Sequence, residues 1–165
     1  MKKLLLLLLL IPLISCTEDW TGEKDIISER LQECRDKAYE KETSVIEYTS
    51  DVKDCETVGL TYEDQRLNVN YKKLMSLLSD EKKILLRNKQ REWIKYRDKE
   101  ALSMTFRNPE TGEVEDKIYY SSWWEMSQAE GKIGELSIQA TLRELTKKRA
   151  DELADMLIKF NNEVL

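Results

Sequence analysis

The sequence contains no histidine, the residue that most often serves as a general base in enzymes and as a protein ligand of transition metals. This absence excludes Ser-His and Cys-His catalytic pairs and histidine-containing zinc sites. The five glycines form no phosphate-binding loop. The many carboxylates have the spacing expected of solvated helix faces. We therefore expect no enzymatic activity, no metal and no cofactor.

The sequence also lacks a block of basic residues. Its 27 Lys and Arg are outnumbered by 32 Asp and Glu, which gives a formal net charge of −5 at pH 7. Nucleic-acid-binding domains usually carry a clustered basic patch, so we do not expect a nucleic-acid partner. An acidic surface attracts cationic molecules by electrostatic steering, and this favours a cationic protein partner.

A single long apolar run lies at the N-terminus. Lys2 and Lys3 precede a leucine-rich segment over residues 4–13, which is shorter than the roughly 20 apolar residues that a membrane-spanning helix needs. It is typical of a signal peptide. The ending Leu-Ile-Ser-Cys at residues 13–16 resembles the bacterial lipobox, in which the cysteine is acylated and becomes the new N-terminus. The alternative is an uncleaved N-terminal anchor.

The lipobox resemblance implies a signal peptide over residues 1–15, a lipid on Cys16, a tether over residues 16–24 and one domain over residues 25–165. We therefore expect a lipid-anchored protein of the cell envelope. Because Thr17 rather than aspartate follows Cys16, a Gram-negative organism would place it in the outer membrane, facing the periplasm. Removing Lys2 and Lys3 with the signal leaves 25 basic and 32 acidic residues, a net charge of −7.

Two further cysteines, Cys34 and Cys55, remain in the processed chain. In an oxidising compartment an even pair is typical of a disulfide. It would close a loop of about 20 residues and stabilise the fold by about 3 kcal/mol in the chain-entropy model. The alternative is a pair of buried free thiols.

Apolar residues recur at helical spacing in several segments. We expect helices over about residues 25–48, from a cap at Thr61 to Leu78, from a cap at Ser79 to about residue 104, and over about residues 135–161, with a shorter helical stretch from Ser122. Residues 49–60 are expected to form a loop, and residues 114–120 a short extended segment. Gly131 and Gly134 either break the last helical region or allow another backbone to approach. The fold class is all-α, with about four helices built around an antiparallel helical hairpin.

The most specific segment spans residues 64–98. If its two helices form an antiparallel hairpin that turns near Ser79, Asp64 lies near Arg97 and Asn68 lies near Gln90. We predict a partly buried Asp64–Arg97 ion pair with an Asn68–Gln90 polar layer beside it. A binding site made of these polar groups is the functional alternative.

This segment resembles the LprI family of small bacterial secreted proteins, which is named for a lysozyme-inhibiting lipoprotein. The family pattern is a cysteine, here Cys55, followed by Asp-x-x-Leu-Asn-x-x-Tyr and Gln-x-x-Trp-x-x-Tyr-Arg-Asp. Ala101 and Thr141 stand where many members have two further cysteines. The resemblance implies a non-enzymatic helical domain that in some members inhibits lysozyme, with Cys34 as the disulfide partner of Cys55. The matching motif residues are Asp64, Leu67, Asn68, Tyr71, Gln90, Trp93, Tyr96, Arg97 and Asp98.

The candidate partner-binding region is the loop from Phe106 to Tyr120 and the aromatic residues that follow it. Exposed aromatic clusters are common interface anchors, whereas buried ones would fill the gap between the hairpin and the last helix. The expected partner is a protein, such as a cationic lysozyme; a structural envelope lipoprotein and a peptidoglycan or glycan binder are the alternatives. The candidate binding residues are Tyr119, Tyr120, Trp123 and Trp124.

Overall fold

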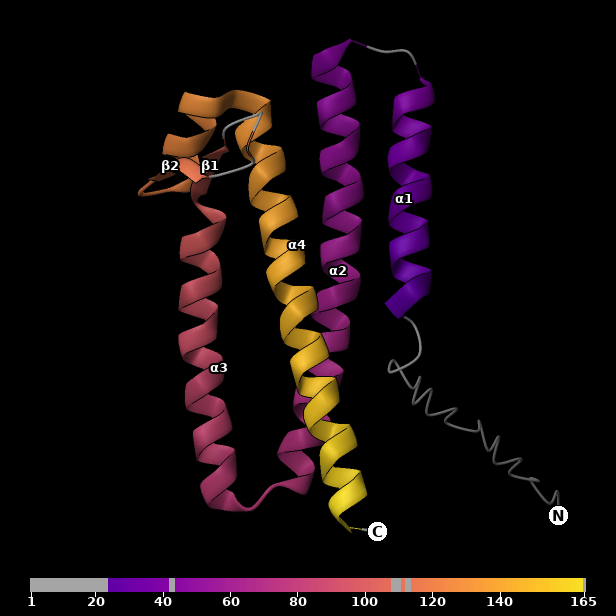
Figure 1. Ribbon diagram of the computed structural model, residues 1–165, viewed down its shortest axis with the longest axis vertical. Coiled ribbons are helices and arrows are strands. Elements are labelled where there is room, and N and C mark those ends of the chain that lie inside the picture. Colours follow the sequence, from indigo (N-terminus) through magenta and orange to yellow (C-terminus); the bar gives the residue numbers. More distant parts are fainter. Residues whose placement is uncertain (1–23, 42–43, 108–110, 112–113, 165) are drawn as a thin grey trace, which may run out of the picture.

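The computed structural model describes residues 24–41, 44–107, 111 and 114–164. The signal peptide, Cys16 and most of the tether lie outside these residues. Four helices and one two-stranded antiparallel hairpin make up the described fold (Figure 1), so the predicted all-α class is confirmed. The elements are α1 (Lys24–Glu40), α2 (Val45–Leu77), α3 (Asp80–Ala101), β1 (Ser103–Arg107), β2 (Val114–Tyr119) and α4 (Trp123–Val164).

The long helices α2 and α4 form the centre of the molecule and pack along each other. Helix α1 packs on α2, and α3 packs on α4 (Figure 1). The predicted turn between two antiparallel helices lies at Leu78 and Ser79, where α2 ends and α3 begins. Ser79 is the N-cap residue of α3, although its side chain makes no capping hydrogen bond.

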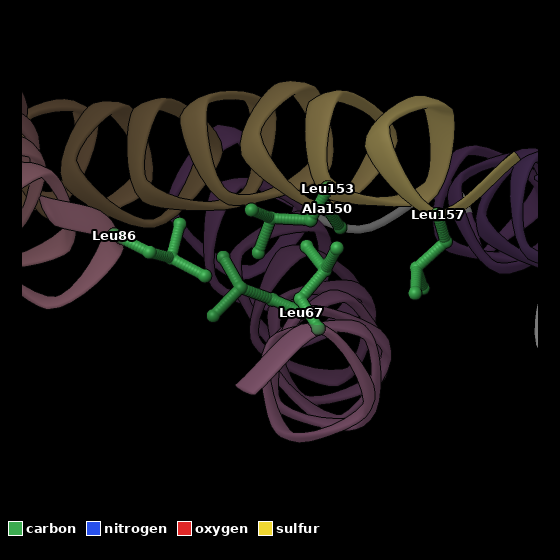
Figure 2. Packing of buried hydrophobic residues seen from close by; sticks show 6 residues of the cluster. Leu67, Leu86, Ala150, Leu153 and Leu157 are labelled. Carbon is green, nitrogen blue, oxygen red and sulfur yellow. The ribbon is translucent and has the colours of Figure 1, made fainter. Parts of the chain in front are cut away.

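The main hydrophobic core joins α2, α3 and α4. Leu74, Leu86 and Leu153 are almost fully buried, and Figure 2 shows Leu86 of α3 and Leu67 of α2 directed toward α4. Burying a leucine side chain stabilises the fold by about 1.5–3 kcal/mol. The buried members of this core are Leu67, Leu74, Leu86, Ala150, Leu153 and Leu157. A second cluster beneath the β-hairpin contains Ala101, Met126 and Ile138.

A disulfide joins Cys34 of α1 to Cys55 of α2, as predicted. The predicted loop around Cys55 is wrong, because residues 49–60 lie inside α2. Helix α2 begins earlier than expected because Ser44 and Glu47 form a capping box, in which each side chain accepts a hydrogen bond from the other residue's backbone N–H. Thr61 is therefore not a cap, and its hydroxyl donates to the Thr57 carbonyl oxygen.

After α3, the structure differs from the prediction in where the helix ends and agrees with it on the extended segment. Helix α3 ends at Ala101 rather than at about residue 104, because the chain enters β1 there. The predicted extended segment is β2, which pairs with β1 in antiparallel register. Gly131 interrupts α4 with a φ of 59°, a conformation that favours glycine. At Gly134 a Cβ atom would lie 3.0 Å from the Met126 carbonyl oxygen, so both expectations for the glycines are met.

Candidate partner-binding site

Seven of the nine family-motif residues line a groove of about 390 Å³ between α2 and α3; Tyr96 and Asp98 do not. Asp64 and Arg97 face each other across it, with 3.7 Å between the Asp64 carboxylate and an Arg97 guanidinium nitrogen. The predicted ion pair is therefore present. We call this the motif groove; its lining residues are Asp64, Leu67, Asn68, Tyr71, Arg87, Gln90, Arg91, Trp93, Ile94 and Arg97.

Arg97 connects several groups of the motif. Its guanidinium lies 5.2 Å from the centre of the Trp93 ring, and it also binds Asp98 at 2.8 Å. Burial raises the pKa of the Asp64 carboxyl, and the Arg97 charge opposes that shift. Arg97 thus pairs with the Asp64 carboxylate while its own guanidinium covers the face of Trp93, an arrangement that favours a positive charge.

The predicted Asn68–Gln90 polar layer is wrong. Gln90 is buried, and its side-chain oxygen accepts a 3.0 Å hydrogen bond from Arg149 of α4. Asn68 is exposed, as are Tyr96 and Asp98, whereas Leu67 belongs to the main core. Gln90 lines the motif groove, but its hydrogen-bond partner comes from α4, against which α3 packs. The motif residues therefore have three different roles. Leu67 belongs to the core, Gln90 links α3 to α4, and others line the groove.

The predicted aromatic cluster lies beyond the C-terminal end of α3, beside the β-hairpin and the start of α4. Three of its four residues are exposed: Tyr119 at 47%, Trp123 at 50% and Trp124 at 66%. We call these three residues the aromatic patch. Exposed aromatic side chains close together in the chain are typical of a protein interface. At the tip of the predicted loop, Thr111 is described, but residues 108–110 and 112–113 lie outside the described residues.

Tyr119 is held in place by charged neighbours on α3 and β2. Its hydroxyl donates a 3.1 Å hydrogen bond to Glu100, and the ammonium groups of Lys99 and Lys117 lie 5.0 and 5.1 Å from its ring centre. Lys117 also forms an ion pair with Glu100, and its hydrogen bond lowers the pKa of the Glu100 carboxyl. These contacts fix the Tyr119 ring and place two cations next to it.

Tyr120 differs from the other three aromatic residues because it packs inward. Its ring lies against the cluster of Ala101, Met126 and Ile138, and its backbone N–H donates to the Leu102 carbonyl oxygen at 2.8 Å. The Tyr120 hydroxyl donates to the Glu130 carboxylate. This hydrogen bond raises the pKa of Tyr120 to about 12. Tyr120 therefore anchors the end of β2 beneath the patch.

A model of the lysozyme inhibitor LprI family matches residues 34–153. The chain belongs to this family. The match begins at the disulfide cysteine Cys34, ends at the core residue Leu153, and includes both the motif groove and the aromatic patch. No curated protein and no solved structure matches the chain.

This LprI-family domain also contains buried charges that the sequence interpretation missed. Glu56 of α2 is fully buried and accepts hydrogen bonds from Arg35 of α1 at 2.9 Å and from Arg143 of α4 at 2.6 Å. The same carboxylate thus links three helices. The sequence contains one signal for this buried position. Glu56 follows Cys55 directly and lies on the same helix face as Leu67.

A second buried network lies further along the interface between α2 and α4 of this family member. Arg66 is 1% exposed and binds Asp151, the Lys147 carbonyl oxygen at 3.2 Å and Glu63 at 3.3 Å. Burial raises the pKa of Glu63, and the nearby Arg66 charge opposes it. Both networks join helices of the scaffold, so we assign them to the fold rather than to partner binding.

The described residues of the LprI-family chain contain no group of three or more residues that could hold a metal ion. Within the same residues, no helix is both long enough and apolar enough to cross a membrane.

Proposed function

We propose that this chain inhibits a lysozyme from a lipid-anchored position in the cell envelope. The observation that carries the proposal is the match of the lysozyme inhibitor LprI family over residues 34–153. The acidic processed chain, with a net charge of −7 from 25 basic and 32 acidic residues, supports a cationic target. Opposite charges would speed their encounter.

The aromatic patch is the proposed contact surface for lysozyme. Glycoside hydrolases carry a pair of carboxylic acids in their substrate cleft, so an inhibitor that covers the cleft benefits from cations next to apolar surface. Lys99 and Lys117 flank Tyr119 at 5.0 and 5.1 Å, while Trp123 and Trp124 supply exposed ring area. In this arrangement the rings exclude water from the interface and the lysines face the acidic cleft.

An inhibition titration tests the proposed function. The processed chain, residues 16–165 with Cys16→Ser, is mixed with lysozymes of several types at low and moderate salt. We expect stoichiometric inhibition of at least one type, with weaker binding at moderate salt because surface charges are screened within about 10 Å at 0.1 M. A chain that inhibits none of the tested types at any salt concentration would contradict the proposal.

The proposed anchor is tested separately by cell fractionation. We expect the full-length chain to appear in the membrane fraction with lipid on Cys16, detected by mass spectrometry, because two or more acyl chains hold a protein stably on a membrane. The Cys16→Ser chain should lose this modification. An unmodified Cys16 in the mature wild-type protein would refute the anchor.

A glycan-binding function is the second candidate, because Trp123 and Trp124 are exposed beside each other at the start of α4. Aromatic rings of this kind also serve as stacking surfaces for sugars. Pull-down with purified cell-wall sacculi distinguishes the two functions: a glycan binder sediments with the sacculi in the absence of lysozyme, and a lysozyme inhibitor does not.

A further inference from the structure

A second groove lies at the end of the molecule opposite the aromatic patch, where α2 turns into α3 and α4 nears its C-terminus. It has a volume of about 320 Å³ and is lined by six apolar side chains and three lysines. We call it the basal groove. Its lining residues are Leu74, Leu78, Lys82, Leu85, Leu86, Lys89, Met156, Lys159 and Phe160.

Apolar surface at the basal groove is exposed to solvent. Leu85 is 55% exposed and Met156 is 41% exposed, although both line the groove. Leu77, in the last turn of α2, is exposed as well. Single exposed apolar residues are common, whereas a contiguous group of them usually marks a binding surface. A molecule that occupies this groove would therefore bury apolar surface there.

The lysines of the basal groove indicate the charge of that occupant. Across the part of the chain that the structure describes, no carboxylate pairs with Lys82, Lys89 or Lys159, whereas the neighbouring Lys83 pairs with Asp80. Lysine can lay its apolar stem along a hydrophobic surface while its ammonium group reaches the polar boundary. Three such lysines around an apolar groove fit a molecule with acyl chains beneath anionic head groups.

The course of the chain places this end of the molecule toward the N-terminal segment. Helix α1 begins at Lys24, and Figure 1 shows its N-terminal end directed toward the end that carries the α2–α3 turn. A further 23 residues precede Lys24. The β-hairpin, which includes Tyr119 of the aromatic patch, lies at the opposite end (Figure 1). A chain tethered through its N-terminal segment can thus rest the basal groove on a membrane while the patch points away.

We propose that the basal groove docks the domain on an anionic lipid bilayer. Apolar residues such as Leu85 enter the boundary between head groups and acyl chains, and Lys82, Lys89 and Lys159 contact lipid phosphates. The acidic remainder of the chain is repelled by the same surface, which orients the lysine-bearing end toward it. A second copy of the chain is a poorer occupant, because a twofold contact between two basal grooves would bring six lysines together.

Vesicle co-sedimentation tests this proposal. The processed chain with Cys16→Ser, which has no attached lipid, is mixed with phosphatidylcholine vesicles that either contain or lack phosphatidylglycerol. We expect binding to the phosphatidylglycerol vesicles that weakens with added salt, and far less binding to phosphatidylcholine alone. The triple variant Lys82→Gln, Lys89→Gln, Lys159→Gln should bind about 100-fold more weakly, at about fivefold per lysine.

A control of equal charge separates the groove from net charge. The triple variant Lys37→Gln, Lys95→Gln, Lys148→Gln removes three exposed lysines elsewhere on the domain and should retain most of the binding. Leu85→Ser tests the apolar contribution and should also weaken binding. Circular dichroism confirms that each variant keeps its helices. Equal loss in both triple variants, or no binding of the unsubstituted chain to phosphatidylglycerol vesicles, would overturn the proposal.

Two further measurements distinguish membrane docking from dimerisation through the basal groove and from lysozyme inhibition. Analytical ultracentrifugation should show the same mass for the unsubstituted chain and the groove variant; a groove-dependent dimer would assign the groove to a second copy instead. The lysozyme titration should be unaffected by the groove substitutions, because the aromatic patch is distant from them. Membrane docking and lysozyme inhibition can therefore fail independently.

Discussion

Replacing Glu56 with alanine is expected to lower the free energy of unfolding by about 3–5 kcal/mol, because it removes the only buried carboxylate that Arg143 pairs with among the described residues. Glu56 is fully buried, and its two carboxylate oxygens accept hydrogen bonds from Arg35 and Arg143. Arg143 is itself only 6% exposed. Water therefore cannot replace the lost carboxylate at Arg143, and the contact between α2 and α4 must open to hydrate it.

Urea unfolding followed by circular dichroism measures this effect, and the chain provides a matched control. Glu144 binds the same Arg143 at 2.6 Å, but its side chain is 62% exposed. Glu144→Gln should therefore cost less than about 1 kcal/mol, as is usual for a surface ion pair. Similar stabilities for Glu56→Ala and Glu144→Gln would mean that the buried carboxylate does not hold the helices together.

The Glu56 network also explains where the sequence interpretation of α2 failed. The apolar stripe from Leu67 to Leu78 was visible in the sequence, and its residues lie in α2 up to the C-cap residue Leu78. Before Leu67, the same buried face continues through small, polar and charged residues, which resemble a solvated or irregular segment when they are read by hydrophobicity alone. A carboxylate becomes a core residue only when arginines from other helices reach it. The buried positions of α2 are Thr49, Val52, Cys55, Glu56, Gly59, Glu63, Arg66, Leu67, Asn70 and Leu74.

Close packing of α1, α2 and α4 is a second reason why the helical conformation of residues 49–60 was not predicted. This packing depends on residues that are far apart in the sequence. Gly59 sits where a Cβ atom would lie 2.7 Å from the Arg143 side chain. In the sequence, glycine within a stretch of polar residues favours a loop. In the structure it makes room for the arginine that reaches Glu56. The contact depends on a residue 84 positions further along the chain, which the local pattern cannot reveal.

The candidate site was predictable in part. Pairing the two half-motifs across a turn at Ser79 placed Asp64 beside Arg97, and the structure contains that pair at 3.7 Å. The partner of Gln90 was not predictable, because α4 rather than α2 supplies it. The exposure of the aromatic residues also depends on tertiary packing. Met126 turns inward, and residues two positions apart lie about 200° apart around a helix, so Trp124 faces outward.

Trp124→Ala is expected to weaken lysozyme binding by about 30-fold or more while leaving stability within about 0.5 kcal/mol of the wild type. Central tryptophans in protein interfaces commonly contribute 2 kcal/mol or more to binding, which corresponds to that factor. Trp124 is 66% exposed, so little of its contact area is lost on truncation in the free protein. Isothermal titration calorimetry with the inhibited lysozyme, combined with urea unfolding, measures both quantities.

Two comparison variants make the Trp124 result specific. Tyr39→Ala removes a 77% exposed aromatic residue on α1, away from the patch, and should leave lysozyme affinity unchanged. Tyr120→Ala removes a ring that packs against the cluster of Ala101, Met126 and Ile138, so it should lower the unfolding free energy by about 2–4 kcal/mol. If Trp124→Ala binds lysozyme as tightly as Tyr39→Ala does, the aromatic patch is not the contact surface. A loss of affinity confined to Tyr120→Ala would indicate that the β-hairpin matters through its position rather than through exposed rings.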